Sequence, residues 1–225
     1  MIICTISFCQ NEVTRNSRLC KSHNRQSYLY GLNDSELNRM TNKNQNSCGI
    51  CRKTGVNLFV DHDHSCCPNG KSCGKCVRGL ICLQCNTALS RFDENPYLIK
   101  RAIQYLQKSY FDTRKITDEC YDWKDSFWDN KWHLYRLGKN RLNFLMDIQN
   151  DSCAICEEYI QGRHFSVDHD HSCCNSEKTC GSCVRGLLCQ KCNLGIGYVK
   201  DNIKILDCMV QYLLNQDGSV LEVTY

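Results

Sequence analysis

Val60-Asp61-His62-Asp63-His64 occurs twice in this chain, because the same residue types return in the same order at 167–171. Both copies continue through a cysteine-rich segment. Each copy then ends in Val-Arg-Gly-Leu-x-Cys-x2-Cys-Asn, first at 77–86 and again at 184–193. Acids, histidines and paired cysteines that recur at fixed spacing indicate a duplicated unit whose shared residues serve chemistry and not packing alone.

The composition limits the class of protein. The chain has 225 residues, enough for one or two domains, and 21 cysteines. No charged segment followed by a long apolar run opens the chain, so we expect neither a signal peptide nor a membrane partner. Without a secretory signal, a cysteine-dense chain more often binds metal than forms disulfides. The sequence therefore predicts a zinc protein of the reducing cytoplasm.

The formal charge of +4 is a weak argument for a nucleic-acid partner once metal is included. A zinc ion held by four thiolates carries about −2 overall, and one held by three thiolates and a neutral histidine about −1. One mixed site and two all-cysteine sites lower the net charge by about 5, to roughly −1. Any nucleic-acid surface must therefore be local.

The N-terminal segment 1–30 contains four soft ligands with the pattern Cys-x4-Cys-x10-Cys-x2-His. The segment has too few apolar residues for a core of its own, so the pattern predicts a small tetrahedral zinc knuckle. The alternative is a set of scattered cysteines in an unstructured terminus, but the Cys-x2-His pair has ligand spacing. The expected ligands are Cys4, Cys9, Cys20 and His23.

A helix from about 34 to 46 should lead the chain into the first module. Asn33 can cap it, Glu36 can reach back three residues, and Leu32 can pack on Leu37. The segment 137–149 gives the second module a related approach.

Each module should then run strand, cysteine-rich loop, strand and helix, which predicts an α+β fold. The expected strands are 56–60 with 77–81 and 165–167 with 184–188, and helices follow Asn86 and Asn193.

A longer helix should close each module. Asn95-Pro96 is a typical helix start, with proline at the first helical position. The expected packing stripes are Leu98, Ala102, Leu106 and Tyr110 in the first helix and Val199, Ile203, Leu206, Met209 and Leu213 in the second. The predicted organisation is a knuckle (1–30), a first module (31–111), an aromatic-rich connector that packs (112–132), a second module (133–216) and a tail (217–225).

Two Cys-x2-Cys pairs in each module can complete one tetrahedral zinc site with a structural role. The intervening cysteine quartets could bind a second zinc ion, or they could be reduced or partly disulfide-linked thiols, because adjacent cysteines are awkward shared ligands. The chain would then hold three to five zinc ions. The expected structural ligands are Cys48, Cys51, Cys82 and Cys85, with Cys153, Cys156, Cys189 and Cys192; the quartets are Cys66, Cys67, Cys73 and Cys76, with Cys173, Cys174, Cys180 and Cys183.

The acids and asparagines have different chemistry from the thiolates. Asp61 and Asn86 offer hard oxygen ligands, which suit Mg²⁺ better than zinc. Side chains two apart in a strand share a face, so His62 should lie beside His64. A neutral imidazole next to Mg²⁺ can take a proton from water during phosphodiester hydrolysis. The second copy offers the same groups at Asp168, Asn193, His169 and His171, and Arg78 and Arg185 are either phosphate contacts or surface charges on the strands.

With these motifs in place, each module resembles the recombination endonuclease VII family of phage junction-resolving nucleases, part of the His-Me finger (ββα-metal) group. The resemblance covers roughly 48–106 and 153–214. It implies that Asp61 and Asn86 bind one divalent metal ion, that His62 is the general base and that His64 assists at the phosphate. The Cys-x2-Cys pairs would hold zinc, the second copy would match throughout, and the site of action would be the host cytoplasm if a phage encodes the protein.

The sequence thus favours two tandem ββα-metal modules in a Mg²⁺-dependent DNA endonuclease, with paired nicking of duplex or branched DNA by a monomeric pseudo-dimer. Family members usually carry one module and dimerise, whereas this chain carries two. RNA remains open as a substrate. The alternative is a zinc-rich nucleic-acid adaptor without catalysis, which has no need of a doubled Asp-His-Asp-His and asparagine; a RING-type interaction module ranks last.

Overall fold

The structure is a computed structural model that describes residues 2–13, 17–68, 70–107, 116, 126–162, 164–176 and 178–214, with the side chains of 126–129 left out. Its contacts divide the chain into two compact units, Met1–Ser90 with Asp207–Tyr225, and Arg91–Leu206. Within the described ranges no helix is long and apolar enough to cross a membrane. Helices and two small sheets make it an α+β protein, as predicted. The domain boundaries expected from the sequence stay a prediction.

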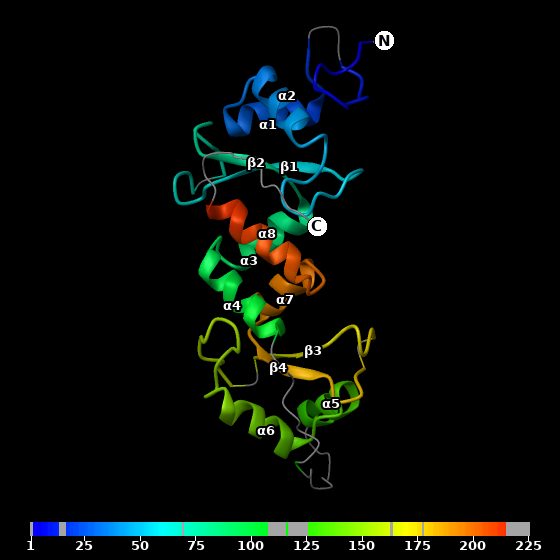
Figure 1. Ribbon diagram of the computed structural model, residues 1–225, viewed down its shortest axis with the longest axis vertical. Coiled ribbons are helices and arrows are strands. Elements are labelled where there is room, and N and C mark those ends of the chain that lie inside the picture. The colour runs from blue at the N-terminus through cyan, green and yellow to red at the C-terminus, as the bar shows by residue number, and fades with distance from the viewer. Residues whose placement is uncertain are drawn as a thin grey trace. The chain divides into compact units, whose positions relative to one another are not determined.

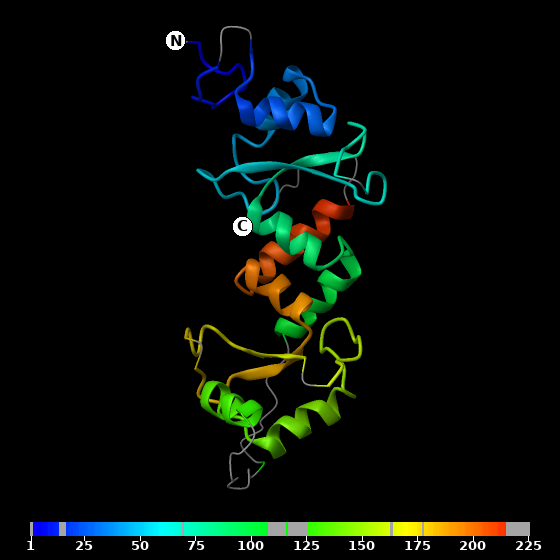
Figure 2. The same ribbon diagram turned by 180° about the vertical axis from the view of Figure 1, so that it is seen from behind.

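The first unit is built around a two-stranded antiparallel sheet. Figures 1 and 2 show α1 and α2 on one side of this sheet and the C-terminal end of α8 on the other. Its elements are α1 (Lys21–Tyr30), α2 (Asp34–Lys43), β1 (Leu58–His62), β2 (Val77–Cys82), α3 (Leu83–Arg91) and the later residues of α8 (Ile203–Leu214).

Helix α2 begins as the sequence predicts. The Asn33 side chain accepts from the Glu36 amide at 2.9 Å, and the Glu36 carboxylate accepts from the Asn33 amide at 2.7 Å. Leu32 and Leu37 are buried in one hydrophobic cluster. That cluster also contains Ile6, so the N-terminal knuckle shares its apolar core with the first sheet.

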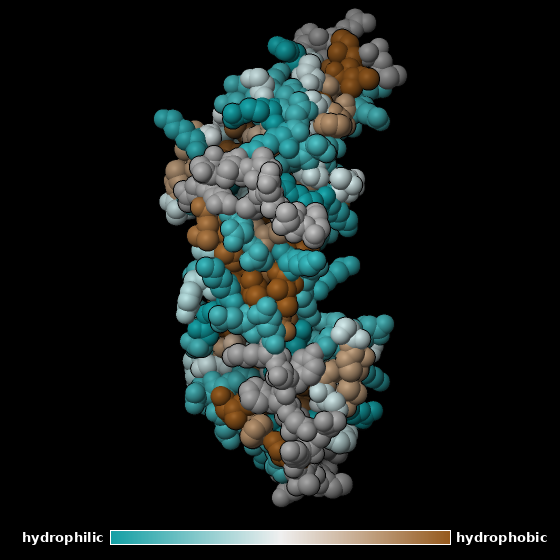
Figure 3. All heavy atoms as spheres, viewed as in Figure 1, coloured by the Kyte–Doolittle hydropathy of each residue, from teal (hydrophilic) through white to brown (hydrophobic). Residues whose placement is uncertain are grey.

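Three large apolar side chains are exposed on the N-terminal knuckle. Figure 3 shows hydrophobic residues gathered at this end of the chain. Ile2, Ile3 and Phe8 have exposed fractions of 53%, 52% and 63%.

The second unit repeats the plan. Helices α5 and α6 lie on one side of its sheet, and α4 and α7 lie on the other (Figures 1 and 2). Its elements are α4 (Pro96–Gln107), α5 (Ser126–Tyr135), α6 (Lys139–Ile148), β3 (Ser166–His169), β4 (Val184–Leu188), α7 (Gln190–Tyr198) and the first residues of α8.

Two expectations need correction, and a third falls largely on residues that the structure does not describe. The buried face of α4 is Ile99, Ala102 and Tyr105, whereas the predicted Leu98 and Leu106 are only half-buried and Tyr110 lies outside the described residues. Strands β1 and β3 extend beyond the apolar run into the Asp-His pair, because that pair continues the ladder. The end of the connector, from Ser126, belongs to helix α5, and the rest of 112–125 apart from residue 116 lies outside the described residues, as does the tail.

Both sheets contain the same register shift at the Asp-His pair. Asp61 lies opposite Gly79, and the next residue, His62, lies opposite Val77. Strand β2 therefore contains one extra residue at this point, Arg78, which has no partner in β1. The second sheet shifts in the same way around Arg185. A β-bulge re-aims the side chain at the extra residue, and here it turns an arginine toward the neighbouring aspartate.

Candidate active sites and metal-binding clusters

Asp61 is buried in a two-pronged ion pair with Arg78. Arg78 Nε donates to Asp61 Oδ2 at 2.7 Å and Nη2 donates to Oδ1 at 3.1 Å, while Nη2 also donates to the backbone oxygen of His62 at 2.9 Å. The Asp61 side chain is 1% exposed and the Arg78 side chain 11%. This geometry fixes the plane of the carboxylate. The alternative interpretation of Arg78 as a strand-surface charge was wrong.

A tyrosine from the last helix completes the surroundings of Asp61. Tyr212 Oη donates to Asp61 Oδ2 at 3.0 Å. Burial raises the pKa of Tyr212 well above its usual value, and the negative charge of Asp61 raises it further, so the hydroxyl keeps its proton and stays a donor. A Cβ at Gly79 would lie 3.1 Å from Tyr212 Oη. Glycine at this position therefore allows the close approach.

The second site has the same arrangement, and its arginine is more deeply buried. Arg185 Nε donates to Asp168 Oδ2 at 2.6 Å and Nη2 donates to Oδ1 at 3.1 Å; Tyr105 Oη donates to Oδ2 at 2.8 Å. Burial raises the pKa of Asp168 although Arg185 opposes the rise. The pKa of Tyr105 is raised well above its usual value, first by burial and then by the charge of Asp168.

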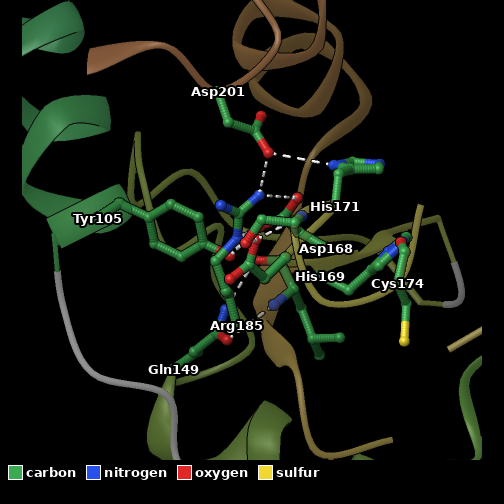
Figure 4. Close-up of polar contacts among 11 residues, drawn as sticks. Tyr105, Gln149, Asp168, His169, His171, Cys174, Arg185 and Asp201 are labelled. Atoms are coloured by element: carbon green, nitrogen blue, oxygen red, sulfur yellow. Dashed lines mark hydrogen bonds and ion pairs between the residues drawn. The ribbon is translucent and has the colours of Figure 1, made fainter. Parts of the chain in front are cut away.

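Asp201 links this ion pair to the second histidine of the motif. Its Oδ2 accepts from Arg185 Nη2 at 2.6 Å and lies 3.1 Å from His171 Nδ1. Figure 4 shows Arg185 between Asp168, Asp201 and the ring of Tyr105. Asp201 Oδ1 is buried and has no hydrogen-bond partner among the described residues.

The first histidine of each motif is held by a backbone carbonyl. His62 Nε2 lies 3.1 Å from the oxygen of Cys67, and His169 Nε2 lies 3.1 Å from the oxygen of Cys174. Because a carbonyl oxygen only accepts, Nε2 must carry the proton, and Nδ1 then has the lone pair of a general base. The geometry thus places the proton on Nε2 and leaves Nδ1 as the nitrogen that can accept one.

The two histidines of each motif lie together as predicted, although the second histidine follows the end of its strand in a turn. The ring centroids of His62 and His64 are 4.4 Å apart, and those of His169 and His171 are also 4.4 Å apart. His62 is buried, whereas His64 is exposed. The buried histidine is the one with a fixed tautomer, and the exposed one is accessible to a ligand.

The second aspartate of each motif has a local structural role. Asp63 Oδ1 accepts from the amide and the hydroxyl of Ser65, at 2.8 and 2.7 Å. Asp170 does the same with Ser172 at the same distances. Each aspartate therefore caps the turn that starts the cysteine-rich loop.

The asparagines lie where the sequence places them. Asn86 is in the first turn of α3 and Asn193 in the first turn of α7, and both are half-buried. Helix α7 packs against β3 and β4.

The four cysteines predicted for structural zinc converge in each module. Cys51 and Cys82 Sγ atoms are 3.8 Å apart, and so are those of Cys156 and Cys189. Zinc–sulfur bonds of about 2.3 Å in a tetrahedron place the sulfurs about 3.8 Å apart. The amide of Gly49 donates to the Leu80 oxygen at 2.8 Å and ties the first Cys-x2-Cys pair to β2. Both sets of sulfur atoms fit a zinc ion.

The two cysteine quartets and the N-terminal group also converge. Every described cysteine is a free thiol in the structure. In all five groups the ligand atoms lie within 4.8 Å of one another, and the N-terminal group brings Cys4 Sγ within 3.3 Å of His23 Nδ1. Five groups can therefore hold zinc: Cys4/Cys9/Cys20/His23, Cys48/Cys51/Cys82/Cys85, Cys66/Cys67/Cys73/Cys76, Cys153/Cys156/Cys189/Cys192 and Cys173/Cys174/Cys180/Cys183.

Sequence reasoning missed three residues of these sites, Tyr105, Tyr212 and Asp201. The tyrosines lie one position from an apolar stripe, and their contacts depend on packing between distant segments. One signal was present in the sequence: the glycine after each arginine leaves room for a side chain against the strand.

The comparisons with known proteins agree with the repeat. A family model described as recombination endonuclease VII matches residues 22–108 and 129–215. No curated protein and no solved structure matches the chain.

Proposed function

The chain belongs to the recombination endonuclease VII family, and from this membership we propose that it is a DNA endonuclease that hydrolyses phosphodiester bonds at two sites. The observation that carries the proposal is the doubled arrangement of a buried aspartate beside a histidine whose tautomer is fixed by a carbonyl. Both copies have it in full, which supports two active centres and not one centre made by two halves.

The donor set of the second site is compatible with a magnesium ion. A carboxylate offers about four lone-pair positions. Contacts in the described part of the chain use three of those on Asp168, two at Oδ2 and one at Oδ1. One position at Oδ1 can still serve a ligand bond, and Asn193 offers an amide oxygen of the hard type that Mg²⁺ prefers.

Asp61 with Asn86, and Asp168 with Asn193, would hold the cation. When bound, it would stabilise the negative charge that develops on the phosphate and on the leaving oxygen. Arg78 and Arg185 orient the carboxylates. Their predicted contact with a phosphate stays a prediction.

The histidines supply the proton chemistry. Nδ1 of His62, and of His169 in the second site, takes the proton from the attacking water while Nε2–H remains bonded to the loop carbonyl. His64 and His171 stand beside these rings and assist at the phosphate, and Asp201 orients His171 through Nδ1.

We further propose paired nicking by a monomeric pseudo-dimer. Two sites on one chain provide what family members obtain by dimerising, so duplex or branched DNA is the expected substrate. The test is a panel of linear duplex, plasmid, four-way junction, single-stranded DNA and RNA, each with Mg²⁺ and with EDTA. Cleavage of DNA that requires Mg²⁺ supports the proposal, and binding without cleavage would favour the zinc-rich adaptor.

A further inference from the structure

The two kinds of all-cysteine cluster differ in exposure. In the first module the Cys48/Cys51/Cys82/Cys85 cluster is largely buried, whereas Cys66 and Cys73 of the quartet are exposed. The sulfurs of the quartet are 3.9 to 4.0 Å apart between Cys66 and Cys67, Cys66 and Cys73, and Cys73 and Cys76. These separations fit a zinc tetrathiolate, in which sulfurs lie about 3.8 Å apart.

One ligand of each quartet also holds the general base. Cys67 contributes its sulfur to the quartet and its backbone oxygen to His62 Nε2, at 3.1 Å. Cys174 has the same two roles toward its quartet and His169. Only the Cα and Cβ atoms and the carbonyl carbon of one residue separate the sulfur from the oxygen that fixes the imidazole.

The segment between histidine and quartet is a tight turn that can transmit a shift. The amides of Cys66 and Cys67 donate to the Asp63 oxygen at 3.2 and 3.1 Å, and the Asp63 amide donates to the Cys76 oxygen at 3.0 Å. In the second module the amides of Cys173 and Cys174 both donate to the Asp170 oxygen at 3.1 Å. In each module the first two cysteines and the last cysteine of the quartet are therefore hydrogen-bonded through their backbones to one aspartate, Asp63 or Asp170. That aspartate directly follows the general-base histidine in the chain.

We propose that each exposed quartet binds an exchangeable zinc ion, and that this ion positions the general-base histidine through the carbonyl of Cys67 or Cys174. Loss of the ion lets the loop carbonyl move and frees the imidazole, while the buried cluster keeps the module folded. Zinc occupancy of the quartets then sets the activity of sites that are already folded. The inference rests on the proposed function for the role of the histidines, but the coupling between zinc and imidazole stands on geometry alone.

The test uses the full chain and the double variant Cys73→Ser/Cys180→Ser, which changes one exposed ligand in each quartet and leaves Cys67 and Cys174 in place. Cys208→Ser is the matched control, because Cys208 is a half-buried thiol that belongs to none of the five groups. Four quantities are measured: zinc per chain, the far-UV circular dichroism spectrum, the nitrogen-15 signals of the histidine rings, and kcat and KM for DNA cleavage.

The double variant should lose two zinc ions per chain and keep its secondary structure. The ring signals of His62 and His169 should lose the single Nε2–H form, and kcat should fall about 10- to 100-fold with little change in KM, as for other residues that orient a group at a site. The control should match the wild type. The inference is overturned if the double variant keeps its zinc, or if it loses two ions while the ring signals and kcat stay unchanged.

A second measurement covers the case in which the double variant does not fold. A zinc-selective chelator is titrated into the wild type in excess Mg²⁺, and zinc is then added back. The first two ions to leave should change both ring signals and lower kcat, and added zinc should restore both; persistence of the signals and of kcat overturns the inference. A wild type that cuts no DNA, yet whose ring signals respond to zinc, would contradict the proposed nuclease function and not this coupling.

Discussion

Tyr212 donates a hydrogen bond to Asp61, although 151 residues separate them in the chain. Tyr105 stands in the same relation to Asp168. In each case the tyrosine lies in the closing helix of one repeat and the aspartate in the strand of the other. Each proposed active site is therefore completed by the opposite repeat, which gives a physical reason for both repeats to be kept in one chain.

Tyr212→Phe should lower cleavage at the first site. The change removes one charge-assisted hydrogen bond, and a loss of about 1.4 kcal/mol in the orientation of Asp61 corresponds to a rate about 10-fold lower. The rate is measured in a His169→Ala background, in which only the first site works.

The same substitution in a His62→Ala background is the control. Only the second site works there, and its tyrosine is Tyr105, so the rate should not change. An equal loss in both backgrounds would mean that Tyr212 acts through general stability.

Arg185→Met should destabilise the protein by about 3–5 kcal/mol, because it leaves the carboxylate of Asp168 buried without its partner. Equilibrium unfolding in urea measures the loss. Asp168→Asn added to Arg185→Met should recover much of it, since the buried charge of Asp168 is then gone and only the more exposed carboxylate of Asp201 is left without the guanidinium.

The loss in Arg185→Met should also depend on pH. Burial already raises the pKa of Asp168, and removal of the guanidinium raises it further. A group whose folded pKa lies above its unfolded value stabilises the fold at low pH and loses that contribution as the pH rises through the folded pKa. The destabilisation should therefore be smaller at the acidic end of a pH series than at its alkaline end; a larger loss at the lower pH would contradict this account of Asp168.

Gly186→Ala should destabilise the second module by about 1–3 kcal/mol. The new Cβ would lie 2.9 Å from Gln149 Oε1, which accepts from the Leu187 amide at 2.9 Å, and a displaced Gln149 would leave that backbone group without its partner. Gly197→Ala is the matched control in the same unit, because its Cβ would meet nothing within 4 Å and it lies in helix α7. Thermal unfolding should show a loss for the first variant and a small gain for the second.

Cys153→Ser should remove one zinc ion and unfold the second module. Cys153 is 1% exposed within the buried cluster, and a structural zinc site contributes about 10 kcal/mol or more to folding. Elemental analysis and far-UV circular dichroism measure both effects. A variant that lost zinc and kept a native spectrum and unfolding transition would refute the structural role.

Much of the fold follows from local sequence signals. The Asn33–Glu36 capping box, the start of α4 at Pro96 and the limits of β4 were all predictable, since each depends on residues close together in the chain. The convergence of the cysteine groups followed from ligand spacing.

The rest depends on contacts between distant segments. The spacing of apolar residues predicted that α4 would bury Leu98 and Leu106. In the structure α4 instead buries the face that contains Tyr105, because that face packs against the rest of the unit. The role of Arg78 followed from a bulge that no local pattern announces. The tyrosines of the two sites could be recognised only once each closing helix was seen against the opposite sheet.

The most direct test of two independent sites compares His62→Ala, His169→Ala and the double variant with the wild type on supercoiled plasmid and on a four-way junction, in Mg²⁺. Loss of a general base lowers the rate at its site about 10²- to 10⁴-fold. Each single variant should accumulate singly nicked product, the wild type should go on to paired cuts, and the double variant should be inactive. Paired cuts by either single variant at the rate of the wild type would contradict the assignment of one active centre to each repeat.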